Sequence, residues 1–136
     1  MALLVRDNRV IIPWLRDAAP PASGSTGAMT AITMAGPGVY FTNPEDVGTF
    51  SELIGFLNVT AADGASTMDI VLQGSADGKV FDDLKAGSDK FVQVTTAVVH
   101  ELYKFEANFG KYIRFKITLA GAAASYTFSL KLVAKG

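Results

Sequence analysis

Apolar and polar residues alternate with a period of two over three stretches of the chain. Residues 111–119 (KYIRFKITL) and 125–133 (SYTFSLKLV) follow this pattern closely, and residues 66–73 (STMDIVLQ) follow it less regularly. Because successive side chains of a strand point to opposite faces, each stretch is predicted to form a half-buried antiparallel strand. The positions predicted to face inward are Ile113, Phe115, Ile117, Leu119, Tyr126, Phe128, Leu130, Leu132, Met68, Ile70 and Leu72.

The remaining strands are predicted from short apolar runs between turn residues. Residues 50–60 (FSELIGFLNVT) are apolar on both faces, which suits a central strand or one covered by the N-terminal segment. Residues 43–46 (NPED) are expected to form one helical turn at most. Further strands are expected near residues 38–42, 80–84, 90–95 and 98–106. Many short strands predict a sandwich or barrel, and we expect an all-β, jelly-roll-like antiparallel β-sandwich of about eight strands.

The N-terminal part has a different character. We expect an extended arm and flexible linker over residues 1–35 and the β-sandwich domain over residues 36–136. Residues 18–28 (AAPPASGSTGA) have the composition of a linker, and the segment before them is too short to fold alone. Its apolar residues therefore need a surface, which is either the chain's own domain or a neighbouring subunit. These residues are Leu3, Leu4, Val5, Val10, Ile11, Ile12, Trp14 and Leu15.

Composition limits the classes of function. The chain has 136 residues, of which 49% are apolar and 18% charged, so one ordered domain is expected. The formal net charge is -1, with lysine and arginine dispersed, so neither a nucleic-acid nor a membrane partner is expected. The N-terminus lacks the pattern of a signal peptide, and no apolar run is long enough for a membrane span. Without cysteine, disulfides and thiolate metal sites are excluded.

Candidate catalytic chemistry is sparse. His100 is the only histidine, so a multi-histidine metal site is excluded and any Ser-His-Asp triad would have to use this residue. Its position among alternating polar and apolar residues predicts a surface or interface histidine. We therefore expect no enzyme, no catalytic residues and no cofactor.

Four aspartates, Asp77, Asp82, Asp83 and Asp89, lie close together around predicted turns. They lack the D-x-D-x-D-G spacing of a calcium loop, and turn formation by Asp77 and Gly78 accounts for the first of them without an ion. No metal site is expected.

Aromatic residues offer a candidate sugar platform. The candidates are Trp14, Tyr40, Phe81, Tyr103 and Tyr112. Tyr112 is on the outward phase of its predicted strand and is the best candidate glycan contact. The others are expected to serve the core.

A resemblance to known proteins is carried by residues 69–78 (DIVLQGSADG), followed by Phe81 and Leu84. With the strand at 112–115 (YIRF) and the closing strand at 126–133, this resembles small jelly-roll or β-sandwich virion proteins of tailed bacteriophages, over about residues 50–134. Phe81 stands where the pattern has tryptophan. Carbohydrate-binding jelly rolls share the same turn pattern.

The resemblance implies a non-enzymatic virion structural protein. Within that class we favour a capsid decoration (cement) protein on the capsid surface, with the major capsid protein and further copies of itself as partners. The resemblance also implies a small homo-oligomer, with a trimer favoured, in which the N-terminal arm clasps a neighbouring subunit. The alternatives are a carbohydrate-binding module and a tail or neck protein of the same fold.

Overall fold

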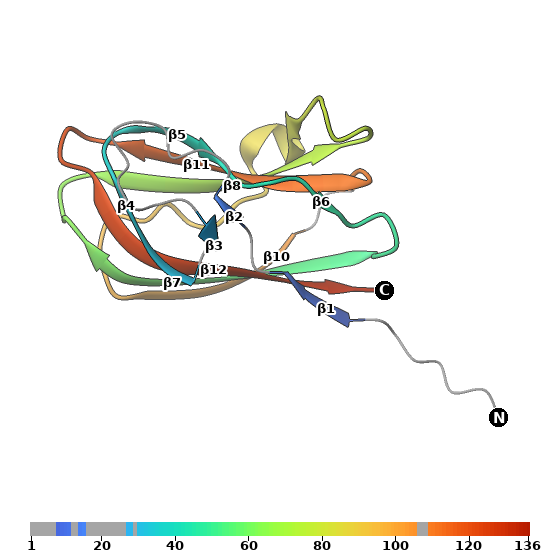
Figure 1. Cartoon of the computed structure of the whole chain (residues 1–136). Helices are drawn as coiled ribbons and strands as arrows, with labels where there is room; N and C mark the ends of the chain where they lie inside the picture. Colours follow the sequence, from blue (N-terminus) through green and yellow to red (C-terminus); the bar gives the residue numbers. More distant parts are fainter. Residues whose placement is uncertain (1–7, 12–13, 16–26, 29, 106–108) are drawn as a thin grey trace.

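The computed structural model describes residues 8–11, 14–15, 27–28, 30–105 and 109–136 (Figure 1). Nearly all regular structure in these residues is β-strand, and the helical part is one four-residue 3-10 helix, η1 (Leu84–Gly87). No helix within the described ranges is long and apolar enough to cross a membrane. The predicted all-β class is confirmed.

The strands form two five-stranded antiparallel sheets that face each other (Figure 1). The first sheet contains β1 (Asn8–Ile11), β4 (Thr30–Ala35), β12 (Ser125–Lys135), β7 (Glu52–Ala62) and β10 (Val99–Phe105). The second sheet contains β5 (Gly38–Phe41), β6 (Glu45–Asp46), β11 (Tyr112–Ala120), β8 (Thr67–Ser75) and β9 (Asp82–Asp83). A separate short pair joins β2 (Trp14–Leu15) to β3 (Gly27–Ala28).

The strand order is that of a jelly roll. The order is β4-β12-β7-β10 in the first sheet and β5-β11-β8-β9 in the second. β5 and β6 both pair with β11, β5 with residues 116–119 and β6 with residues 112–113. If β5 and β6 are taken as one interrupted strand, the eight strands from β4 to β12 are ordered 1-8-3-6 and 2-7-4-5. This order is the double Greek key of a jelly roll and confirms the predicted architecture.

The core lies between the two sheets and matches the predicted alternation. All eleven residues predicted to face inward are at most 2% exposed. Phe91 and Phe105 join Phe115 in an aromatic cluster, with ring centroids 5.8–6.4 Å apart. The Tyr126 hydroxyl, which is also buried, donates a 2.8 Å hydrogen bond to the carbonyl oxygen of Ser66. Alternation on β8, β11 and β12 therefore builds most of the interior.

Several local expectations are corrected. Residues 80–84 contribute only the two-residue β9, and residues 90–95 contribute only isolated bridges from Lys90 and Val94 to β8. Residues 43–46 contain the short strand β6 where a helical turn was expected. Separately from these corrections, the turn at residues 120–124, with Gly121 at φ 126°, connects the second sheet to the first, because β11 and β12 lie in different sheets.

The N-terminal segment adds a strand to its own sheet in this single chain. β1 pairs with residues 132–135 of β12, while β4 pairs with residues 125–129 of the same strand. Ile11 is 4% exposed and belongs to the core, whereas Val10 is 63% exposed. β4 was not predicted, and it extends the sandwich to the N-terminal side of residue 36. Leu3, Leu4, Val5 and Ile12 lie outside the described residues, as do the side chains of Trp14 and Leu15.

Gly55 of β7 lies directly against the aromatic cluster of the core. As expected for residues 50–60, β7 lies inside the sheet, between β12 and β10. A Cβ atom at Gly55 would lie 2.5 Å from Cζ of Phe91 and 2.9 Å from Cε2 of Phe105. The missing side chain therefore lets the aromatic cluster approach the strand.

Gly55→Ala is expected to lower the free energy of unfolding by about 1–3 kcal/mol, because the added methyl group overpacks the core. Urea unfolding followed by fluorescence measures this loss. The double variant Gly55→Ala/Phe91→Leu should recover part of it by making room. Equal stability of Gly55→Ala and the wild type would contradict the close packing.

Candidate binding face

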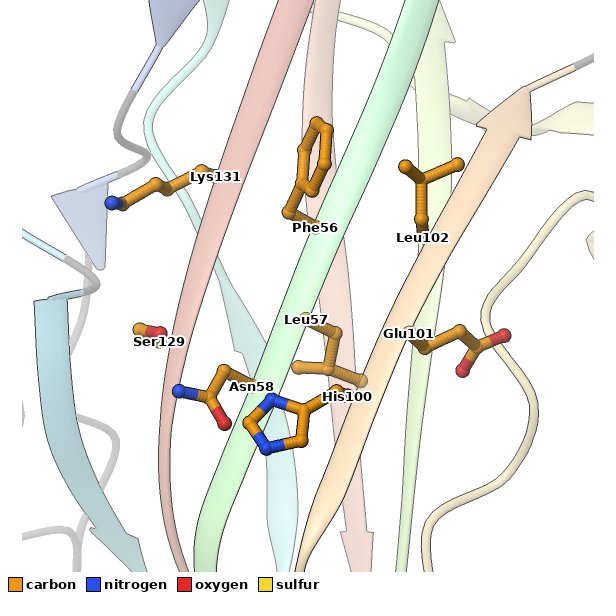
Figure 2. Close-up of a pocket in the computed structure, with 8 residues that line it drawn as sticks. All are labelled: Phe56, Leu57, Asn58, His100, Glu101, Leu102, Ser129 and Lys131. Carbon is orange, nitrogen blue, oxygen red and sulfur yellow. The ribbon is translucent and has the colours of Figure 1, made fainter.

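The outer face of the first sheet gathers side chains from three adjacent strands. In the register of these strands, His100 of β10 and Ser129 of β12 are both paired with Asn58 of β7. One step along the strands, Leu102 and Lys131 are both paired with Phe56. Figure 2 shows these two rows of side chains across β10, β7 and β12.

A shallow hollow of about 410 Å³ lies over these two rows. Phe56 is 39% exposed and Leu102 is 61% exposed, which is high for large apolar side chains. The lining residues are Phe56, Leu57, Asn58, His100, Glu101, Leu102, Ser129 and Lys131. The hollow thus combines apolar side chains with amide, hydroxyl, imidazole and ammonium groups.

The apolar surface continues from the hollow toward β1. Ile54 of β7 is paired with Val133 of β12, which is paired in turn with Val10 of β1. We call Val10, Val133, Ile54, Phe56 and Leu102 the apolar stripe. It crosses four strands, and Val10, Phe56 and Leu102 are among the exposed large apolar residues of the chain. Contiguous apolar surface of this kind is typical of interaction sites.

Asn58 is an unusual member of this face. Its Oδ1 atom is buried and accepts no hydrogen bond from the residues that the structure describes. Leaving such an acceptor without a donor costs about 1–3 kcal/mol. Figure 2 shows the Asn58 amide beside the His100 ring, on the side of the hollow away from Phe56 and Leu102.

His100 is exposed at the hollow, which agrees with the surface position expected for it. His100 is paired across the strands with Asn58, which carries an amide, and Asn58 is paired with Ser129, which carries a hydroxyl. The row therefore pairs the histidine with neutral hydrogen-bonding groups.

Three of the four aspartates, Asp77, Asp83 and Asp89, have hydrogen-bond partners within the protein, and Asp82 is exposed. Asp77 accepts hydrogen bonds from the backbone N–H groups of Lys79 (2.8 Å) and Val80 (3.1 Å), which lower its pKa. Asp83 accepts hydrogen bonds from Gln73 and Lys116, both at 2.8 Å. Among the described residues, no three histidine, aspartate or glutamate side chains are grouped so that they could hold a metal ion.

Asp89 and Tyr103 bind each other near the core. Asp89 is fully buried and accepts a 2.8 Å hydrogen bond from the Tyr103 hydroxyl. The Tyr103 ring packs against Phe105, with centroids 5.1 Å apart. Tyr40 is also buried and donates to the carbonyl oxygen of Gly36 at 2.9 Å. These two tyrosines serve the interior.

The outer face of the second sheet holds two further candidate aromatics. The Arg114 guanidinium lies between the rings of Phe41 and Phe81, 4.1 and 4.2 Å from their centroids. Tyr112 is half-buried, next to Gly78 of the Asp-Gly turn and 5.4 Å from Nζ of Lys111. Among the candidate aromatics whose side chains the structure describes, Tyr40 and Tyr103 serve the interior, and Phe81 stacks on Arg114. Tyr112 therefore remains the candidate glycan contact.

Phe56, Asn58 and Leu102 were not predicted as site residues. The signal available in the sequence was the apolar character of residues 50–60 on both faces, which places Phe56 on the outward phase. The pairing of β7 with β10 and β12 is needed to see that these side chains converge.

No protein-family model matches the sequence, and no curated protein is significantly similar to it. Solved structures do share the fold. The VP2 subviral particle of infectious bursal disease virus matches with a TM-score of 0.58 and 13% identity, over 96% of this chain and 32% of that chain. PBSX exported protein XepA matches with a TM-score of 0.54 and 16% identity, over 79% of this chain and 35% of that chain.

The prophage-derived protein YomS of SPBc2 matches over 100% of this chain and 99% of its own, with 12% identity and a TM-score of 0.46. The chain spans about a third of the length of the VP2 and XepA chains. At these identities the likeness shows the fold alone. The chain is an antiparallel β-sandwich of the jelly-roll class.

Asp77→Ala is expected to lower the midpoint of thermal unfolding, because the loop after β8 loses the acceptor for its backbone N–H groups. Millimolar calcium should change the midpoint of neither the wild type nor the variant, since the carboxylate already serves the turn. Thermal scans with calcium and with EDTA provide the measurement. A calcium-dependent rise in the wild type that is lost in the variant would instead indicate an ion site.

Proposed function

We propose that this chain is a non-enzymatic structural protein of a phage virion, a capsid decoration (cement) protein that binds the lattice of the major capsid protein. The observation that carries the proposal is the apolar stripe on the outer face of the first sheet. The jelly-roll fold, which the chain shares with a viral capsid protein and with a phage-derived protein, is consistent with this role.

The energetics of the stripe favour a protein partner. Burial of apolar surface contributes about 25 cal/mol per Å², so a few hundred Å² would favour binding by several kcal/mol before the costs of association. The stripe crosses β1, β12, β7 and β10, so it is extended enough to meet a protein surface. Lys104, paired with Ile54, and Lys131, paired with Phe56, border it, so apolar side chains lie beside cations as at the rim of a protein interface.

The N-terminal arm is the second element of the proposal. In the single chain, β1 pairs with the C-terminal end of its own β12. The same pairing made with a neighbouring copy would clasp two subunits together, because β1 supplies both main-chain pairing and the Ile11 side chain. We propose that the copies form a small oligomer, with a trimer favoured, at the capsid surface.

Copy number in purified particles tests the location. Quantitative mass spectrometry against the major capsid protein should find the chain at near-stoichiometric abundance if it decorates the shell. A much lower copy number per particle would support the alternative, a tail or neck protein of the same fold. Absence from particles would leave the alternative of a carbohydrate-binding module, which the mixed apolar and polar character of the hollow favours.

Leu102→Asp is expected to weaken binding to undecorated capsids by about tenfold or more, because it places a charge in the apolar stripe. Its own fold should survive, since Leu102 is 61% exposed. Val39→Asp is the matched control, because Val39 is 46% exposed but lies on β5 of the second sheet. Co-sedimentation with capsids measures both. Equal binding by the Leu102 variant and the control would contradict the proposed capsid contact.

Cysteine pairs test the clasping arm, because the natural chain contains no cysteine. Val10 and Val133 are directly paired, at a separation that suits a disulfide. Co-expressed chains carrying Val10→Cys or Val133→Cys alone are expected to form a disulfide-linked dimer on a non-reducing gel. Val39→Cys with Val133→Cys should not link. A disulfide that forms only within one chain carrying both substitutions would show that β1 remains on its own subunit.

A further inference from the structure

β10 forms an open edge of the first sheet. It pairs with β7 on one side, and no strand within the described residues follows it on the other. Alternate residues of an antiparallel strand direct their N–H and C=O groups to opposite sides, so those that face away from β7 need another partner or water. Among the described residues, no loop supplies a backbone hydrogen bond to residues 99–105. The edge is therefore available to a further strand.

The segment that precedes β10 belongs to the other sheet. Lys90 and Val94 form bridges to β8. The same segment meets β10 through a side chain, because the backbone N–H of Val92 donates a 3.0 Å hydrogen bond to Glu101 Oε1. The Glu101 carboxylate is therefore already held by its own chain.

Exposed apolar side chains lie on either side of His100 in the sequence. Val98, which directly precedes β10, is 66% exposed, and Leu102 is 61% exposed. By the alternation of a strand, both share the outward phase of His100, and Figure 2 shows His100 and Leu102 on β10. Natural proteins commonly protect an open edge with lysine or proline, and residues 98–102 contain neither. This stretch is therefore suited to pairing with another strand.

The same positions select a second copy of this stretch as the partner. In an antiparallel pair with a two-fold axis at His100, Val98 of each copy lies opposite Leu102 of the other. An axis at Glu101 would place two carboxylates opposite each other. An axis at Leu102 would place His100 opposite Lys104 and move Val98 away from Leu102. The axis at His100 thus pairs apolar with apolar side chains and keeps each Glu101 apart from its copy.

We propose that two copies of the chain join through β10, antiparallel and about a two-fold axis at His100, so that their first sheets form one continuous sheet. The inference goes beyond the proposed function and does not depend on it. The outer faces of both copies lie on the same side of the joined sheet, so the apolar stripe stays open to a capsid. The clasp proposed for β1 uses β12, on the other side of β7, so both contacts can form together.

Sedimentation velocity of the isolated protein over a range of concentrations is the first test. The wild type should associate reversibly, and Val98→Asp should weaken this association by about tenfold or more, because it places a charge opposite Leu102. Val80→Asp is the matched control, because Val80 is 68% exposed but lies in the loop between β8 and β9. A wild type that stays monomeric, or equal association of the two variants, would overturn the inference.

Single cysteines test the register, since the natural chain has none. Chains carrying Val98→Cys are mixed under reducing conditions with chains carrying Leu102→Cys and are then oxidised. The mixture should give a disulfide-linked dimer on a non-reducing gel. Neither variant should link by itself, because identical positions would lie four residues apart along the paired strands, about 13 Å. The absence of a link in the mixture, or a link formed by Leu102→Cys alone, would overturn the register.

The charges around His100 determine how the pairing depends on pH. Lys131 lines the same hollow, and Lys104 shares the outward phase of β10. The residue paired with His100 on β7, Asn58, is neutral. The acidic neighbour on the strand, Glu101, is engaged by a backbone N–H group. An imidazolium of the partner copy would therefore add positive charge to cationic surroundings.

Lower pH should accordingly separate the copies. Because histidine gains its charge as the pH falls from about 8 to about 5, the dissociation constant of the pair should rise about tenfold or more over this range. His100→Gln should remove most of this dependence, since glutamine stays neutral. Sedimentation velocity at the two pH values measures both proteins. Equal association of the wild type at both values, or the same pH dependence in His100→Gln, would overturn the place of His100 at the axis.

Discussion

The pairing of β12 with β7 is the interaction on which the rest of the structure depends. It aligns the inward residues Phe128 and Leu130 of β12 with Val59 and Leu57 of β7, all four of which are buried. The same pairing places Ser129 and Lys131 beside Asn58 and Phe56 on the outer face. The other edge of β12 then accepts β4 and β1. One register therefore determines the core, the hollow and the place where the N-terminal segment docks.

The two outer faces of the sandwich differ in how completely their groups are satisfied. On the second sheet, Arg114 is held between two rings and donates to Gln73 at 2.7 Å. Gln73 in turn donates to Asp83, which also accepts from Lys116. The first sheet instead carries exposed apolar side chains around a buried acceptor without a donor. The outer face of the first sheet is therefore the one whose side chains leave more to be gained by contact with a partner.

The alternation of apolar and polar residues was sufficient to predict β8, β11 and β12 and their buried positions. It was not sufficient for β4 or β6, which are short and owe their strand conformation to pairing with β12 and β11. Likewise, the amino-acid sequence predicts that Phe56 is apolar and faces outward, but it does not predict which side chains lie beside it. The hollow is a product of register, and register between distant strands is set by the packed core.

β1 and β4 pair with separate parts of the same edge of β12, so β1 can unfold independently of β4. β4 covers residues 125–129 and β1 covers residues 132–135, while β7 pairs with β12 along both parts. β1 can therefore open as a local unit without unfolding the sandwich; its departure exposes the Ile11 site and a short stretch of strand edge and breaks the Arg9–Glu45 ion pair. The stability of this small unit, rather than that of the whole domain, would set how readily β1 leaves its own β12 for the clasp that we propose.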